Sequence, residues 1–247
     1  MLLKRLLPIL IAGTLLPTLA QADTILGWRM GANVWQQNYS GEVQSGPSAI
    51  DIEDDLGYAE ETGYNLYLAF EHPVPLLPNI MISRTQIDAD ARGNVVGFEF
   101  EGITYSGDVR STVELTNTDV TLYYELLDNW VNLDLGITAR YFDNGVAITD
   151  VATGLTGELD IDYVIPLVYA QARFDLPFSG LSLGVEGNAI SYDDDTLYDV
   201  KLNLAYEFAF GLGIEAGYRV FDLDYDDDDE FANLTIEGAY AGFVWDF

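Results

Sequence analysis

Apolar and polar residues alternate along most of this chain, and the alternation is its main structural signal. Side chains two positions apart on a strand share a face, so a period of two predicts strands with one apolar face. The clearest segment is 131–141, where Leu133, Leu135 and Ile137 alternate with Asn132 and Asp134. Similar segments predict about ten strands: 23–38, 62–71, 79–91, one ending over 120–126, 131–141, 158–174, 181–189, 198–208, 212–220 and 231–247.

Three of these segments have an ambiguous phase. The segments 79–91 and 158–174 do not alternate cleanly, and if both are loops the strand number falls to eight. In the last segment, Leu234 and Ile236 have the opposite parity from Phe243 and Trp245. A β-bulge would explain this change of face, and so would an upper part of the strand that lies above a bilayer.

The expected connections differ in kind along the chain. Four are short and carry Pro, Gly or Asn, whereas five are longer or acidic: about 39–61, 92–110, 144–157, 193–195 and 226–230. Short turns at one end and longer loops at the other are typical of transmembrane β-barrels. A soluble β-sandwich or barrel would show the same alternation with its apolar face inward. Strands that alternate over 10 to 14 residues favour the membrane form, because soluble strands are usually shorter.

The first 22 residues have the pattern of a secretory signal peptide. Lys4 and Arg5 precede the apolar run 6–16, and Ala20-Gln21-Ala22 offers a cleavage site between small residues. The apolar run is too short to span a bilayer as a helix. We therefore expect residues 1–22 to be a signal peptide and residues 23–247 to form one barrel domain.

Composition excludes several classes of protein. The formal net charge of −31 excludes a nucleic-acid-binding protein, which needs a basic surface. The chain has no Cys, so it has no disulfide and no thiolate site. It is 49% hydrophobic and has 16 Tyr, yet no later segment reaches 18 consecutive apolar residues. Abundant apolar residues without long apolar runs agree with amphipathic strands.

The C-terminal residues indicate a family resemblance. Phe243, Trp245 and Phe247 fall on one strand face, and Phe247 is the last residue. This ending resembles that of Gram-negative outer-membrane β-barrel proteins, which commonly end in Phe after alternating apolar residues. The resemblance implies an all-β, antiparallel, up-and-down transmembrane barrel in the bacterial outer membrane. It also implies contact with outer-membrane lipid and lipopolysaccharide, and recognition of Phe243, Trp245 and Phe247 by the barrel-assembly machinery.

Residues suited to catalysis are scarce. Outer-membrane barrel enzymes generally pair a His with Ser or Asp, because a neutral imidazole can accept a proton near neutral pH. The single His, His72, lies in the Pro-rich turn 72–78, at the end opposite the expected external loops. No Gly-x-Ser-x-Gly, phosphate-loop or His-based metal motif is present. We therefore expect no catalytic residues and no cofactor.

Two further groups of residues are candidate binding sites. Carboxylates alternate near the end of the chain, which suits weak calcium binding, although the spacing does not match an EF-hand; they are Asp222, Asp224, Asp226, Asp228 and Glu230. Charged residues also occupy the polar face at mid-strand, where they would line the lumen of the barrel; they are Arg29, Asp134, Arg140, Glu186, Lys201, Glu207, Glu215 and Arg219.

The sequence therefore predicts a non-enzymatic outer-membrane barrel with a structural or surface-interaction role and acidic external loops. A barrel of about ten strands encloses little more than its own side chains. The alternative function is a narrow channel that prefers cations, because Asp199 also falls on the inward face, where acidic residues then outnumber basic ones.

Overall fold

The computed structural model describes residues 26–45, 48–142, 144–193, 195–227 and 230–247, so the expected signal peptide lies outside the described residues. Ten antiparallel strands form a closed barrel, in the order β15-β14-β13-β12-β11-β8-β7-β4-β3-β1, and β1 pairs with β15. The strands of the wall are β1 (Gly27–Ser45), β3 (Glu61–Glu71), β4 (Asn79–Thr85), β7 (Asn117–Leu127), β8 (Val131–Phe142), β11 (Val164–Leu176), β12 (Leu181–Tyr192), β13 (Asp195–Glu207), β14 (Leu212–Asp227) and β15 (Glu230–Asp246). The predicted fold class and the count of ten strands are confirmed.

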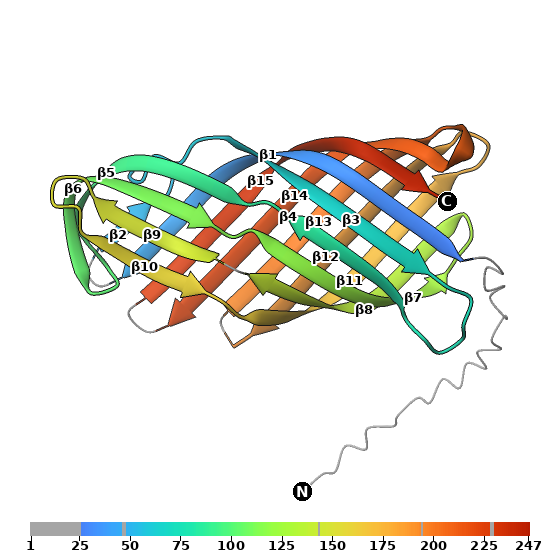
Figure 1. Ribbon diagram of the computed structural model, residues 1–247, viewed down its shortest axis with the longest axis horizontal. Helices are drawn as coiled ribbons and strands as arrows, with labels where there is room; N and C mark the ends of the chain where they lie inside the picture. The colour runs from blue at the N-terminus through green and yellow to red at the C-terminus, as the bar shows by residue number, and fades with distance from the viewer. Residues whose placement is uncertain (1–25, 46–47, 143, 194, 228–229) are drawn as a thin grey trace, which may run out of the picture.

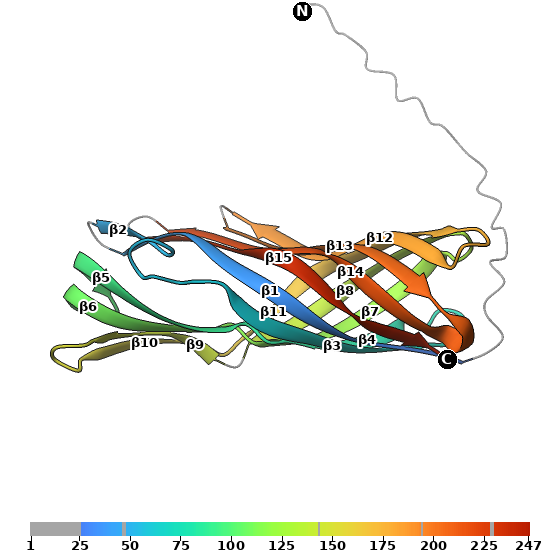
Figure 2. The ribbon, with the colours of Figure 1, turned by 90° about the horizontal axis from the view of Figure 1, so that it is seen from above.

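A second sheet extends one end of the barrel (Figure 1). This crown sheet has the order β10-β9-β6-β5 and consists of β5 (Asp88–Phe100), β6 (Ile103–Glu114), β9 (Asn144–Asp150) and β10 (Thr156–Ile161). The short strand β2 (Ser48–Asp51) pairs with the upper part of β1. Seen from above, the crown sheet and the extended ends of β1, β2 and β15 form two layers (Figure 2). We call this the crown end.

The opposite end carries the four short connections, at 72–78, 128–130, 177–180 and 208–211, and we call it the turn end. The last of these includes the 3₁₀ turn η1 (Ala209–Gly211). Both ends of the described chain meet here, because Trp28 and Phe247 exchange backbone hydrogen bonds of 2.8 and 2.9 Å. In the described part of the chain, no helix has the length and hydrophobicity needed to cross a membrane.

Three predicted loops are largely strands. Segment 39–61 contains the upper part of β1 and all of β2, segment 92–110 lies in the β5–β6 hairpin, and segment 144–157 contains β9. The two predicted strands that do not alternate cleanly are each divided. Segment 79–91 breaks at Gln86 and Ile87, between β4 and β5. Segment 158–174 breaks at Asp162 and Tyr163, between β10 and β11. The alternation was hard to assign there because the chain leaves the barrel wall and enters the crown sheet, where inward side chains are apolar.

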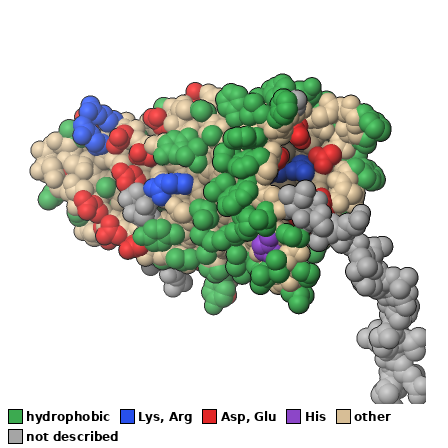
Figure 3. All heavy atoms as spheres, turned by 45° about the vertical axis from the view of Figure 1, so that its right-hand side comes forward, with side chains coloured by type: hydrophobic (Ala, Val, Ile, Leu, Met, Phe, Trp, Pro, Cys, Tyr) green, Lys and Arg blue, Asp and Glu red, His purple; other side chains and the backbone are tan. Residues whose placement is uncertain are grey.

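The outer wall carries an apolar belt (Figure 3). On β8, the side chains of Leu135 and Ile137 are exposed while those of Asp134, Thr138 and Arg140 are buried. This is the reverse of a soluble barrel, in which apolar residues face inward, and it agrees with the outward face predicted from the sequence.

At the crown end the interior itself is apolar. A buried core fills the space between the crown sheet and β1, β14 and β15; it includes Trp35, Ile87, Phe98, Tyr105, Phe221 and Ile236, each at most 1% exposed. Leu234 and Ile236 face this core, and β15 pairs with β14 without any register shift. Of the two explanations for the change of face, the bulge in β15 is therefore wrong. The change of face occurs because the interior is apolar at the crown end and polar at the turn end.

Candidate functional site in the barrel lumen

Below the apolar core, polar side chains cross the barrel interior in register. Residues paired across neighbouring antiparallel strands lie on the same face, so each pair extends the row by one strand. One such row crosses six strands, and its members in order are Glu125, Asp134, Gln171, Glu186, Lys201 and Arg219. The alternation that puts most leucines of these strands outside thus brings the polar side chains to the inner face, with Glu125 exposed at the rim of the turn end.

Four buried charges close the lumen directly under the apolar core, and we call Asp119, Arg140, Asp199 and Arg219 the charge layer. Arg140 binds Asp119 through two parallel hydrogen bonds, Nε to Oδ1 at 2.8 Å and Nη2 to Oδ2 at 2.7 Å. Arg219 binds Asp199 in the same way, with both distances 2.7 Å. Asp199 Oδ2 also accepts a bond from Arg140 Nη2 at 2.7 Å, which joins the two pairs.

The charge layer is held on both sides. On the crown side, the Arg219 guanidinium lies 4.6 Å from the centre of the Trp35 ring, and that of Arg140 lies 6.0 Å from the Phe221 ring. On the turn side, the space beside the layer offers about 10 Å³ to the centres of water molecules. This is about the space that one water needs. Nη1 of Arg140 and Nη1 of Arg219 are buried without a hydrogen-bond partner among the described residues, so the space suits one bound water and the layer leaves little room for more.

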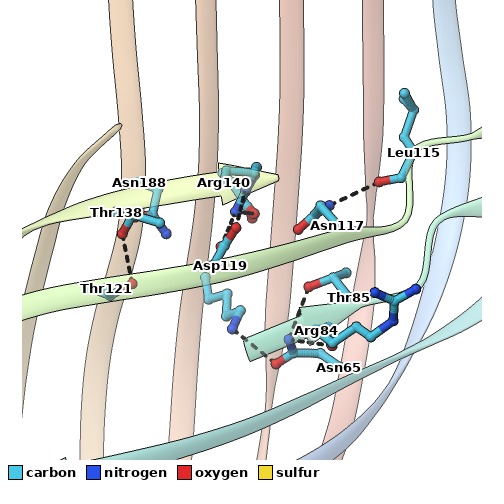
Figure 4. Close-up of polar contacts among 12 residues, drawn as sticks. Asn65, Arg84, Thr85, Leu115, Asn117, Asp119, Thr121, Thr138, Arg140 and Asn188 are labelled. Carbon is cyan, nitrogen blue, oxygen red and sulfur yellow. Dashed lines mark hydrogen bonds and ion pairs between the residues drawn. The ribbon is translucent and has the colours of Figure 1, made fainter. Parts of the chain in front are cut away.

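Further hydrogen bonds, most of them between neutral groups, fix the surrounding side chains (Figure 4). Thr138 Oγ1 bonds to Thr121 Oγ1 at 2.8 Å and donates to Asn188 Oδ1 at 2.6 Å, across β7, β8 and β12. Asn65 donates to Thr85 Oγ1 at 3.0 Å and accepts from Lys201 Nζ at 3.3 Å. Side chains from strands on both sides of the barrel thus meet at its axis.

A cavity lies between the charge layer and the turn end. It offers about 40 Å³ to the centres of water molecules, which is room for about three. Its charged lining is nearly balanced, with Glu71, Asp134, Glu186 and Glu215 facing Arg29, Arg173 and Lys201. Asp134 Oδ1 is buried without a protein partner and so suits a bound water. A cavity of this size holds water but not an organic solute.

Tyrosine rings narrow this cavity by lying across glycines of the neighbouring strand. Gly31 pairs with Tyr67, and a methyl group at Gly31 would clash with the ring, at 2.3 Å from Cε1. Gly217 pairs with Tyr240, and a methyl group there would lie 2.9 Å from the ring and 2.0 Å from the Leu202 carbonyl oxygen. Glycine is needed at both positions because the ring occupies the space that a side chain would take.

The structure places most predicted lumen residues around these two spaces. Arg29, Asp134, Glu186, Lys201 and Glu215 line the cavity, and Arg140 and Arg219 belong to the charge layer. Glu207, the last residue of β13, is exposed at the turn end and lines neither space. Sequence reasoning placed Asp199 on the inward face without giving it a role, and it did not single out Asp119 as a site residue. The sequence signal for both aspartates is their position in the alternation, which puts them on the same face as Arg140 and Arg219 of the paired strands.

The predicted acidic metal site is only partly described. Asp222, Asp224 and Asp226 lie on the outer face of β14, and Asp222 Oδ2 accepts a hydrogen bond from Thr235 at 2.7 Å. Asp228 lies outside the described residues, as does the side chain of Glu230. Among the described residues, which include Asp222, Asp224 and Asp226, no three His, Cys, Asp or Glu side chains are grouped so that they could hold a metal ion. Calcium binding by this run stays a prediction.

Two other predicted features are at the turn end. Phe243, Trp245 and Phe247 are exposed on the outer wall, and Trp245 Nε1 donates to the Phe210 carbonyl at 3.2 Å. His72 lies in the β3–β4 turn, where Nε2 is 3.2 Å from the Pro78 carbonyl and Nδ1 accepts from the Val74 backbone N–H at 3.3 Å. Both ring nitrogens of His72 therefore bond to backbone groups of the β3–β4 turn and stabilise it.

Comparison with known proteins identifies the fold. No protein-family model matches the chain, and no curated protein sequence matches it. Among solved structures, it is similar to the outer membrane protease OmpT from Escherichia coli, with 10% identity, a TM-score of 0.53, and coverage of 92% of this chain and 98% of that one. A weaker match is the translocator domain of the autotransporter NalP from Neisseria meningitidis, with 12% identity, a TM-score of 0.36, and coverage of 89% and 88%. The chain thus has the closed, ten-stranded antiparallel fold of the outer-membrane β-barrels.

Proposed function

We propose that this protein is an integral outer-membrane barrel with a sealed lumen that presents its crown to the outside, in a non-enzymatic structural or surface-interaction role. The apolar belt supports insertion in the membrane. The short connections at the turn end support a periplasmic position for that end. The observation that carries the proposal is the charge layer under the apolar core, because together they fill the barrel from wall to wall.

The expected partners follow from this orientation of the barrel, with the crown outside and the turn end in the periplasm. The belt would contact outer-membrane lipid, and lipopolysaccharide would surround the barrel where the belt meets the crown. The C-terminal strand, with Phe243, Trp245 and Phe247, would be recognised by the assembly machinery. The acidic residues beyond the belt would attract divalent cations, which suits weak and exchangeable binding.

A catalytic role has little support in this chain. The similar E. coli structure is that of a protease, but 10% identity extends the likeness to the fold alone. The one His of the sequence is held in the β3–β4 turn by Pro78 and Val74, at the far end from the crown. Because the sequence has no second His, the crown end offers none to a histidine-dependent catalytic site.

The second candidate is a narrow, cation-preferring conduit. The acidic residues of the turn-end cavity favour it, since Glu71, Asp134, Glu186 and Glu215 outnumber the basic residues there. Conduction would require the charge layer to separate and the apolar core to admit water. The buried ion pairs oppose the first step, and the close packing at the crown end opposes the second.

Conductance across a planar bilayer separates the two candidates. Folding is first verified by heat-modifiable gel mobility. A silent bilayer supports the sealed barrel. Discrete cation-selective steps that change in Glu215→Gln but not in Glu101→Gln would instead support the conduit. Glu101 is the matched control, because it is exposed in the β5–β6 turn and its substitution removes the same charge outside the lumen.

A further inference from the structure

Two arginines on the crown sheet have no acidic partner among the described residues, although the protein is strongly acidic. Arg92 on β5 and Arg110 on β6 are directly paired across the hairpin, and both are exposed. Within the described residues, neither guanidinium has a hydrogen bond or an ion pair. Like charges directly opposite each other destabilise a sheet. The pairing therefore needs a reason outside the folded chain.

The other basic side chains beyond the expected signal peptide are all engaged. Arg140 and Arg219 form the charge layer, and the remaining ones bind within the barrel: Arg29 to Asp246, Arg173 to Asp175, Lys201 to Asn65 and Arg84 to Thr118. Figure 3 shows basic side chains standing out at the crown end among acidic ones. Arg92 and Arg110 are thus the two cations of this part of the chain that are free to bind something else.

Acidic neighbours of the pair are bound to neutral groups. Asp90 Oδ1 accepts from Thr112 Oγ1 at 2.8 Å, and Asp108 Oδ1 accepts from Asn94 Nδ2 at 2.8 Å. These hydrogen bonds hold each carboxylate beside its own cross-strand partner. The two guanidinium groups are left as unshared donors on the outer face of the hairpin.

The cross-strand pair of Arg92 and Arg110 belongs to a row of paired residues that continues across the whole crown sheet. Arg110 pairs with Thr149 on β9, and Thr149 pairs with Thr156 on β10. The two threonine hydroxyls are 2.9 Å apart and share one hydrogen bond, which leaves a donor available. Three gaps between strands at about 4.8 Å give a row of about 14 Å, with cations at one end and hydroxyls at the other. That length fits an extended polymer better than a single ion.

We propose that Arg92, Arg110, Thr149 and Thr156 form a binding row for an anionic polysaccharide. The two guanidinium groups would hold a sulfate, phosphate or carboxylate group, whose oxygens match their paired N–H groups. The threonines would bind neutral sugar hydroxyls. This inference deepens the surface role of the proposed function and rests on it for the outward position of the crown.

The position of the row argues against a membrane lipid as the ligand. Arg92 lies seven residues beyond Thr85, the last residue of β4 in the barrel wall, which is roughly 20 Å of extended chain. This separation along the chain favours a polymer that extends above the membrane over a head group at the edge of the apolar belt. The overall negative charge of the protein repels polyanions at long range, but salt at about 0.15 M screens charges beyond about 8 Å and leaves the local contact.

Binding of dextran sulfate to the protein, purified in detergent micelles, tests the proposal. We expect saturable binding that uncharged dextran does not show and that inorganic sulfate matches only at far higher concentration. Arg92→Gln and Arg110→Gln should each lower the affinity by roughly tenfold or more, since each removes charged hydrogen bonds. Thr104→Glu is the matched control, because it changes the net charge by the same amount on an exposed position of β6. It should change the affinity less than about twofold.

Three results would overturn the proposal: no binding by the unaltered protein, equal losses in Thr104→Glu and the arginine variants, or inorganic sulfate binding as tightly as the polymer. Loss of folding is separable from loss of binding. Removing one of two facing like charges should keep or raise the unfolding temperature. Bilayer conductance does not depend on this row, so failure here leaves the sealed-lumen proposal to its own test.

Discussion

Arg219 lies over the ring of Trp35, with its guanidinium carbon 4.6 Å from the ring centre, and this contact joins the two halves of the barrel interior. Arg219 is the upper edge of the polar lumen and Trp35 is the lower edge of the apolar core. Both are almost completely buried. A guanidinium can lie between these environments because its edges donate to Asp199 while its flat face packs on the indole.

Replacing Asp199 should strongly destabilise the barrel. Asp199→Asn leaves Arg140 and Arg219 buried without the carboxylate they share, and removal of one member of a buried ion pair costs about 3–5 kcal/mol. Equilibrium unfolding in denaturant would measure the loss. Glu158→Gln, at an exposed site on β10, should stay within about 0.5 kcal/mol. Equal stability of the two variants would refute a role for the charge layer in holding the fold.

Trp35→Ala should cost about 3–5 kcal/mol in unfolding free energy, because it leaves a cavity in the core and exposes the face of Arg219. Trp130→Ala is the control, since Trp130 is exposed in the β7–β8 turn. We also expect Trp35→Ala to admit water to the charge layer, which faster hydrogen exchange of the neighbouring backbone amides would report. Unchanged exchange would show that the core closes over the gap.

Alkaline pH should weaken the crown through Tyr58. Burial raises the pKa of the Tyr58 hydroxyl from about 10 to about 12. The protonated form is therefore favoured in the folded state, so this stabilisation is complete below pH 10 and is lost as the pH rises through 12. Its size is about 2–3 kcal/mol. Tyr58→Phe should flatten the fall in unfolding free energy between pH 9 and 12, whereas Tyr192→Phe, at an exposed position, should leave the slope as it is.

A methyl group at Gly217 should not fit. It would lie 2.0 Å from the Leu202 carbonyl oxygen and 2.9 Å from Cε1 of Tyr240, and the backbone atom cannot move aside. We expect Gly217→Ala to lose about 1–3 kcal/mol of unfolding free energy. The control is Gly27→Ala, whose nearest contact would be an ordinary 3.4 Å to the Glu71 side chain. If both variants fold equally well, the Tyr240 ring does not need the glycine beside it.

Deleting Phe247 should impair folding of the barrel. Its backbone exchanges two hydrogen bonds with Trp28, and these are the last bonds that close β1 against β15. We expect less of the heat-modifiable folded band after deletion. Phe247→Leu keeps the backbone bonds and removes only the aromatic ring. Comparison of the two variants in cells and in refolding with pure lipid therefore separates recognition by assembly factors from closure of the seam.

The sequence alone determined the barrel. Alternation over segments such as 131–141 requires one apolar and one polar face, and ten such segments with short turns at one end leave few other ways to bury backbone hydrogen bonds. It also placed Arg140 and Arg219 on the inward face, because the side-chain period of a strand is two.

Only the tertiary structure decided what fills the interior. Parity gives the face of a residue but not its height or its partner across the barrel, so the meeting of Asp199 with Arg140 from a distant strand could not be derived. The crown was hidden for a related reason. Where β5, β6, β9 and β10 leave the wall, their apolar face turns inward, and a rule based on outward apolar residues makes segments such as 92–110 appear as loops. Strand tilt and the register of closure bring these charges and this core together, and both are properties of the assembled barrel.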